Sequence, residues 1–111
     1  MAGKYEIDKS TDGQFYFRLK AGNGQIILGS ERYKSKQSCQ GGIESVRINS
    51  QDDAQFEKRE SSSKKPYFVL KAKNHEIIGT SELYESASAR DNGIRSVKEN
   101  GKDARVDDLT A

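Results

Sequence analysis

The chain has few of the residues on which many functional sites depend. It contains one cysteine, Cys39, and one histidine, His75, among 111 residues. A single cysteine excludes an internal disulfide and a cluster of cysteine ligands around a metal. No stretch is apolar over the length of a membrane span, and residues 1–6 lack the apolar run of a signal peptide. We therefore expect a cytoplasmic protein that does not enter a membrane.

Excess charge of one sign is also lacking. The chain has 19 Lys and Arg residues against 17 Asp and Glu residues, a formal net charge of +2. A dedicated nucleic-acid-binding domain usually carries a larger basic excess. Apolar and charged residues each make up 32% of the chain, so most elements should show one face to water. The length suits one modest core, and we interpret residues 1–111 as a single domain.

What the chain does contain is an internal repeat with a period of 51 residues. Between residues 16–49 and residues 67–100, 17 of the 34 aligned positions are identical without a gap. We assign repeat 1 to residues 4–53 and repeat 2 to residues 54–109. Because each copy alone would be marginal in size, we expect the two copies to share one core.

Each repeat is predicted to begin with three antiparallel strands. Residues 4–8 and 15–21 alternate between apolar and polar side chains, as half-buried strands do. Asn23 and Gly24 then favour a tight hairpin turn, after which the chain returns as the next strand. The serine-rich segment 61–66 aligns with the first hairpin loop of repeat 1, so we interpret it as a turn rather than a linker.

A helix is predicted near the end of each repeat, because the spacing of apolar residues changes there to that of one helical face. In the first helix this face carries Cys39, Gly42, Ile43 and Val46. A glycine inside a helix lowers its stability by about 1 kcal/mol relative to alanine. Its recurrence at Gly93 indicates that each helix lies close against the sheet.

Both ends of each predicted helix carry capping residues. Ser35 and Ser86 are natural N-caps, and Asn49 and Asn100 stand where a left-handed residue would end the helix. A strand is expected after each helix, and the strand after the first helix also opens repeat 2. The predicted order is three strands, helix, three strands, helix and one strand.

The repeated pattern resembles the YegP-like family of small uncharacterised bacterial proteins, in its duplicated subfamily. The pattern is Phe-x-Leu-Lys-Ala-x-Asn, then Ile-Ile, Ser-Glu-x-Tyr-x-Ser and Gly-Ile-x-Ser-Val with a closing Asn. The resemblance covers nearly the whole chain and implies that the two repeats build one sheet and exchange their C-terminal strands. It brings no catalytic motif. Our expectation is an α+β fold with a single antiparallel sheet and both helices on one face.

Neither of the two scarce residues is given a catalytic role. His75 stands where repeat 1 has Gly24, and we interpret it as a turn residue, because histidine accepts left-handed backbone more readily than most residues. Cys39 falls on the packed helix face as a small hydrophobe. No catalytic residue, metal site or cofactor is predicted.

One candidate binding surface is the sheet face opposite the helices. Aromatic and basic side chains alternate along two strands there, at Tyr16, Arg18, Lys20, Tyr67 and Lys71. Such a face suits single-stranded nucleic acid, through base stacking and phosphate contacts. The same pattern is also typical of an ordinary solvated sheet face.

The other candidate is the pair of strand-to-helix loops. Their polar residues recur in both repeats, at Ser30, Glu31, Tyr33, Ser35, Ser81, Glu82, Tyr84 and Ser86. A functional interpretation is a doubled pocket in which amides of the helix N-terminus bind an anion. A structural interpretation is a helix cap beside a packed tyrosine.

We expect a non-enzymatic binding module whose ligand the sequence does not identify. It should be monomeric, since duplication supplies what a single-repeat relative would obtain by dimerising. Nucleic-acid binding by the open sheet face is one alternative, and a small enzyme whose residues meet only in three dimensions is another. An enzyme should show a concave pocket with convergent titratable groups, and an interaction module a flat exposed patch.

Overall fold

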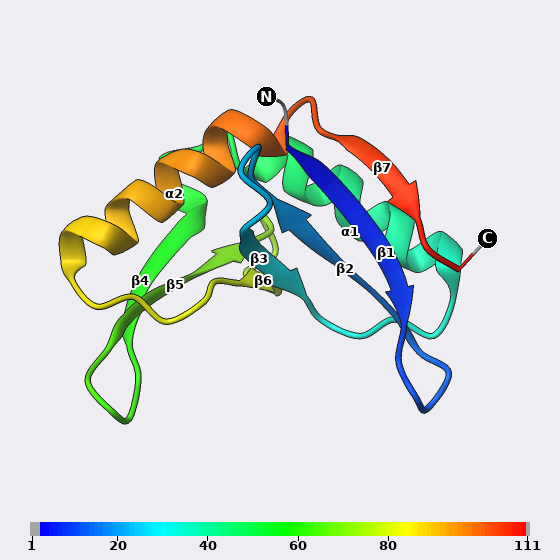
Figure 1. Ribbon diagram of the computed structural model, residues 1–111, viewed down its shortest axis with the longest axis horizontal. Helices are drawn as coiled ribbons and strands as arrows, with labels where there is room; N and C mark the ends of the chain where they lie inside the picture. Colours follow the sequence, from blue (N-terminus) through cyan, green and yellow to red (C-terminus); the bar gives the residue numbers. More distant parts are fainter. Residues whose placement is uncertain (1–2, 111) are drawn as a thin grey trace.

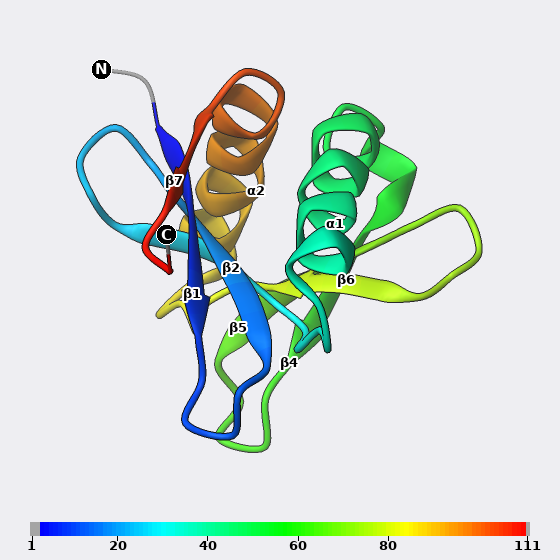
Figure 2. The same cartoon turned by 90° about the vertical axis from the view of Figure 1, so that its right-hand side faces the viewer.

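Figure 1 shows the protein as a computed structural model, which describes residues 3–110. The elements in chain order are β1 (Lys4–Lys9), β2 (Phe15–Lys20), β3 (Ile26–Ser30), α1 (Lys36–Asn49), a 3-10 turn (Asp53–Gln55), β4 (Phe56–Glu60), β5 (Pro66–Lys71), β6 (Ile77–Thr80), α2 (Ala87–Gly101) and β7 (Arg105–Asp108). The predicted order of strands and helices is confirmed. Figure 2 shows both helices on the same side of the sheet.

The seven strands form one sheet in the order β4-β5-β6-β3-β2-β1-β7. β7 follows the helix of repeat 2 and pairs with β1 of repeat 1, which confirms the expected strand exchange. This pairing is parallel, so the sheet is mixed, whereas we had expected an antiparallel one. The two paired strands are the first and the last of the chain, so the connection between them, from Lys9 to Arg105, is far longer than the dozen or so residues that parallel pairing requires.

One hydrophobic core lies between the helices and the sheet, and both repeats contribute to it. Its largest fully buried side chains are Tyr5, Ile7, Phe17, Leu19, Leu28, Ile43, Phe68 and Leu70. Cys39 is fully buried in this core, as predicted. No helix in the described part of the chain is long and apolar enough to cross a membrane.

The helix N-caps are confirmed, and the predicted C-caps are wrong. The hydroxyls of Ser35 and Ser86 accept hydrogen bonds from backbone N–H groups three residues later, each at 3.0 Å. Asn49 and Asn100 lie inside their helices, and neither has a positive φ. Each side-chain amide donates to a carbonyl four residues earlier at 2.8 Å, so it bonds to the helix from within.

The predicted turns are confirmed by their backbone geometry. Gly24 has a φ of 84° and His75 a φ of 71°, and each N–H donates at 2.9 Å across its hairpin turn. In the serine-rich segment, Lys64 has a φ of 66°, and Ser61 N–H donates to the carbonyl of Lys65 at 2.9 Å. The segment is therefore a hairpin turn between β4 and β5.

Candidate functional site

The sheet is open beside the junction of the two repeats. β3 and β6 pair over only two residues each. Beyond β6 the chain follows β5 instead, where Ser81 N–H donates to the carbonyl of Phe68 at 2.9 Å. Tyr84 N–H likewise donates to the carbonyl of Pro66 at 2.8 Å. Among residues 3–110, no strand lies beside the first part of β3 on this side.

The opening forms a groove of about 710 Å³, which we name the β3–α2 groove. The hairpin between β2 and β3 forms one wall, and the loop before α2 and the helix itself form the other. Its lining residues are Ala21, Asn23, Gly24, Gln25, Ile26, Ile27, Glu82, Tyr84, Ala89, Asn92, Gly93 and Ser96. The volume lies in the range of ligand-binding pockets. Both repeats are needed to build it.

The groove offers polar groups with little charge. Amide side chains at Asn23, Gln25 and Asn92 can donate and accept hydrogen bonds. Glu82 is the one charged residue of the lining. Burial, and secondarily the charge of Glu82, raise the pKa of Tyr84, so its hydroxyl is protonated at neutral pH. Such a lining suits a neutral or cationic polar ligand.

Most of the predicted loop residues have structural roles. The hydroxyls of Ser30 and Ser81 accept the backbone N–H groups of Phe17 and Phe68, at 2.9 and 3.0 Å. Tyr33 and Tyr84 stack on the same two phenylalanine rings, with centroids 6.4 and 6.3 Å apart. Ser35 and Ser86 cap the helices.

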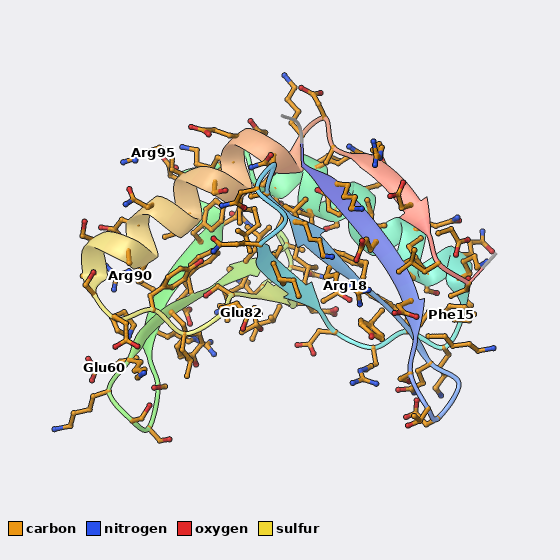
Figure 3. The ribbon with its side chains drawn as sticks, viewed as in Figure 1. Phe15, Arg18, Glu60, Glu82, Arg90 and Arg95 are labelled. Carbon is orange, nitrogen blue, oxygen red and sulfur yellow. The ribbon has the colours of Figure 1, made fainter. Side chains whose placement is uncertain are left out.

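The two loop carboxylates, those of Glu31 and Glu82, make no hydrogen bond or ion pair to the residues that the structure describes. Both side chains are exposed. Glu82 lies in the β3–α2 groove, beneath α2 in Figure 3. It is therefore the loop residue most available to a ligand.

The place beside α1 that corresponds to the β3–α2 groove has different chemistry, although the fold of the two repeats is the same. Burial raises the pKa of Tyr33, and Cys39, Glu31 and Glu76 add to the effect. Glu31 and Glu76 thus lie near one tyrosine, whereas repeat 1 supplies Gln25 at the counterpart of Glu76. The two places have diverged, and the β3–α2 groove is the less acidic one.

On the open sheet face, the predicted cations surround a carboxylate that we did not predict. Glu6 lies 2.7 Å from Arg18, 3.1 Å from Lys20 and 3.3 Å from Lys4. Desolvation raises the pKa of Glu6, but hydrogen bonds from these three cations outweigh it and lower the pKa to about 2. Repeat 2 places Glu57 2.8 Å from Lys71.

These ion pairs reduce the positive charge that Arg18, Lys20 and Lys71 would otherwise present on this face. Its aromatic members are Tyr16 and Tyr67, which are half-buried. The guanidinium groups of Arg18 and Arg32 lie 5.9 and 5.0 Å from the centroid of the Tyr16 ring. Glu6 recurs as Glu57 at the repeat spacing, and this recurrence was the available signal for the missed carboxylates.

Neither Cys39 nor His75 lines the β3–α2 groove. His75 is exposed in its turn. Burial raises the pKa of Cys39 to about 11, so this thiol is not ionised at neutral pH. Within residues 3–110, no group of three or more His, Cys, Asp or Glu side chains is placed to hold a metal ion.

The protein consists of two units, each with three strands followed by a helix, and the units share one sheet and one core. It is therefore a tandem-repeat α+β protein, and a groove lies between its repeats. Each repeat matches the family described as a domain of unknown function, DUF1508, at residues 10–57 and 61–108. The chain belongs to this family.

Relatives of full length support the assignment. The chain is 57% identical over 110 residues to a UPF0339 protein of Acinetobacter baylyi, with 99% of each chain covered. It is 54% identical to the UPF0339 protein YegP of Escherichia coli strain K12, covering 99% of this chain and all of that one. Both relatives bear names that state no activity.

Two solution NMR structures have the same fold. That of E. coli YegP, described as a protein of unknown function, has a TM-score of 0.93 at 53% identity and covers 98% of this chain and 94% of that one. That of a UPF0339 protein from Shewanella oneidensis has a TM-score of 0.92 at 55% identity, with 98% and 92% covered. The comparisons thus establish family and fold without naming a ligand.

Proposed function

We propose that this protein is a monomeric, cytoplasmic, non-enzymatic binding module whose ligand occupies the β3–α2 groove. The observation that carries the proposal is a groove of about 710 Å³ built by both repeats, in which Glu82 has no structural partner among the described residues. Catalysis usually requires several convergent titratable groups. Here the lining brings together one carboxylate and one tyrosine, Glu82 and Tyr84, which supports binding over chemistry.

The lining also indicates the class of ligand. The amides of Asn23, Gln25 and Asn92 favour hydrogen-bonding groups, and Ile26 and Ile27 add an apolar wall. Glu82 favours a positive charge and disfavours a negative one. We therefore propose a small, neutral or cationic polar ligand, or a short segment of such chemistry.

Titration of the full chain followed by ¹H–¹⁵N NMR tests the proposal. The probes are three amino acids that are acetylated on the α-amino group and amidated at the carboxyl end: lysine, asparagine and glutamate. We expect the lysine and asparagine probes to shift backbone signals of residues 23–27 and 92–96, and the glutamate probe to shift them less. Shifts scattered over the surface, or none at all, would remove the groove from consideration.

The repeat supplies a matched control for this titration. Glu82→Gln should weaken binding of the lysine probe, whereas Glu31→Gln, its counterpart in repeat 1, should leave it unchanged. Both side chains are exposed, so neither substitution should disturb the fold. An equal loss of binding in both variants would contradict a role for Glu82.

The open sheet face supports a second candidate, the binding of single-stranded nucleic acid. The observation that favours it is the aromatic ring of Tyr16, flanked by Arg18 and Arg32. A fluorescence titration with short RNA and DNA at low salt tests it. Binding that Tyr16→Ala weakens and that added salt suppresses would support this candidate. No binding at micromolar protein would retire it.

A further inference from the structure

The free edge of β3 directs a backbone donor into the β3–α2 groove. Ala21 N–H donates to the carbonyl of Gln25 at 2.9 Å, so this carbonyl points toward β2. A trans peptide unit is planar, and its C=O and N–H point in opposite directions. The N–H of Ile26, in the same peptide unit as that carbonyl, therefore points away from β2 and toward the groove that Ile26 lines. No strand among residues 3–110 lies there to accept it.

Two side-chain amides add donors on opposite walls of the groove. In the hairpin wall, Asn23 donates to the Oε1 atom of Gln25 at 3.3 Å. In the helix wall, Arg95 donates to the Oδ1 atom of Asn92 at 2.9 Å. The NH₂ groups of Gln25 and Asn92 themselves donate to no acceptor within the described chain. Both walls thus have their acceptor oxygens occupied and their donors free.

Three free N–H donors around one opening match the carbonyls of an extended main chain. Such a chain presents a carbonyl at every residue, alternately to either side. An unpaired strand edge is also the place where an extended segment adds to a sheet through its backbone. Ile26 is 39% exposed, so its side chain offers apolar surface beside the same N–H.

The charge of the groove indicates which side chain the segment carries. Glu82 is the one charged residue of the lining, and it is exposed without an ion pair to the described residues. Figure 3 shows Glu82 below α2 and Arg95 above it, so the arginine does not neutralise this carboxylate. A lysine or arginine of the segment would pair with Glu82, and a carboxylate would be repelled.

We propose that the ligand of the β3–α2 groove is an extended, lysine- or arginine-containing segment of a partner protein, bound through its main-chain carbonyls. The inference rests on the proposed function, because it assigns the class of ligand to the same groove. Ile26 N–H donates to one carbonyl of the segment, and the amides of Gln25 and Asn92 donate to others. The place beside α1 lacks one of these donors, since Gly41 stands where α2 has Asn92.

A short peptide tests this inference against a single amino acid. The probe is acetyl-Thr-Val-Lys-Val-Thr-amide, whose β-branched residues favour an extended chain. In ¹H–¹⁵N spectra of the full chain, we expect it to shift signals of residues 23–27 and 92–96 and to slow hydrogen exchange at Ile26. It should bind about fivefold more tightly than the acetylated and amidated lysine, the scale of one added hydrogen bond. The peptide with glutamate in place of lysine should bind about fivefold more weakly.

One backbone variant removes the donor of β3. Ile26→Pro deletes the N–H that faces the groove, and a strand edge tolerates proline where its N–H is unpaired. This variant should bind the peptide about fivefold more weakly than Ile26→Val, which keeps the N–H. Ile77→Pro is the control in repeat 2, where Ala72 N–H donates to the Glu76 carbonyl in the same way, and it should leave binding unchanged.

A charge variant tests the groove without altering the backbone. Glu82→Lys should reverse the preference between the lysine and glutamate peptides. Because Glu82 is exposed and unpaired within the described chain, this variant should fold, and it decides the case if Ile26→Pro does not fold.

The outcomes separate this inference from the proposed function. If the lysine amino acid shifts the groove but the peptide binds no more tightly, the segment is wrong and the groove remains a binding site. Equal binding by Ile26→Pro and Ile26→Val, or an unchanged preference in Glu82→Lys, would also overturn the inference. So would shifts confined to β4 or to residues 41–45, or self-association through the groove. The absence of shifts with both probes would overturn the inference and the proposed function together.

Discussion

The ring of Tyr84 lies against Gly93 so closely that a Cβ atom at position 93 would come within 2.6 Å of the Tyr84 Cζ atom. The relationship recurs between Tyr33 and Gly42, where the corresponding distance is 2.8 Å. The glycine in each helix therefore makes room for a tyrosine from the loop before that helix. In repeat 2 this contact also shapes the β3–α2 groove.

Gly93→Ala should destabilise the protein even though alanine favours a helix by about 1 kcal/mol. The added methyl group must displace Tyr84 from Phe68, and overpacking of this kind costs about 1–3 kcal/mol. In a Tyr84→Ala background, the same substitution should be neutral or stabilising. Urea denaturation of the four proteins in this cycle measures the difference.

The control for the glycine cycle lies in the other helix. A Cβ atom at Gly41 of α1 would meet nothing within 4 Å, so Gly41→Ala should stabilise the protein by up to about 1 kcal/mol. An equal cost of Gly93→Ala with and without the Tyr84 ring would show that the contact is not the cause.

Glu6→Gln should lower stability at neutral pH by about 1–3 kcal/mol, because three cations lose their shared carboxylate. The folded-state pKa of Glu6 is about 2 and its ordinary value is 4.5. The native ion pairs therefore contribute fully above pH 4.5, and their contribution is lost as the pH falls toward 2.

Chemical denaturation between pH 7 and pH 2 checks the Glu6 prediction. The loss of stability with falling pH should be shallower in Glu6→Gln than in the unmodified protein. Glu60→Gln is the control, because Glu60 is exposed and forms no ion pair within the described chain. If the free energy of unfolding falls equally with pH in all three proteins, the Glu6 cluster has no stabilising role.

Asn100→Ala should cost more stability than Asn49→Ala, by about 1 kcal/mol. Both amides bond within their helices, but Asn100 Oδ1 also accepts the N–H of Gly3 at 3.0 Å. Asn49 Oδ1 is buried without a partner among the described residues, so its removal relieves an unsatisfied group. Denaturation compares the two variants, and hydrogen exchange at Gly3 should accelerate only in Asn100→Ala. Equal costs and unchanged exchange would be the contrary result.

Lys58→Ile should make the protein associate as its concentration rises. Isoleucine is the residue that β1 carries at the matched position, Ile7, and β7 covers the edge of β1. The edge of β4 is open, and a charged side chain at an open edge opposes strand pairing between molecules. Light scattering after size exclusion measures the mass, with Lys58→Gln as the polar control. A monomer of Lys58→Ile at millimolar concentration would show that this lysine does not protect the edge.

Local patterns predicted much of this fold. Ser35 and Ser86 cap their helices because capping requires only a hydroxyl and an N–H three residues away. His75 is in a turn because its left-handed backbone is set within one hairpin. Asn49 and Asn100 were misassigned because an asparagine in the last turn of a helix has two options. Its side-chain amide can bond to a carbonyl of the same helix, or the residue can end the helix, and the sequence around it is the same in both cases.

The candidate site was predicted less well. The loops around Glu82 and Tyr84 were singled out from the repeat, but the wall formed by Asn23 to Ile27 was not. These segments lie more than fifty residues apart in the chain and meet only because the strand pairing of β3 and β6 is short. The pairing of Arg18 and Lys20 with Glu6 was missed for a similar reason, since cross-strand register sets it.

The sequence alone determined the units of this protein: two copies of a strand-rich segment and a helix, with their turns, caps and buried faces. These features depend on residues within a few positions of one another and on the periodicity of apolar side chains. The tertiary structure decided how the copies meet, which edge β7 covers and which edge stays open. Those outcomes depend on backbone pairing between distant segments, where many registers share the same local pattern. The β3–α2 groove arises at this second level, where β3 and β6 part.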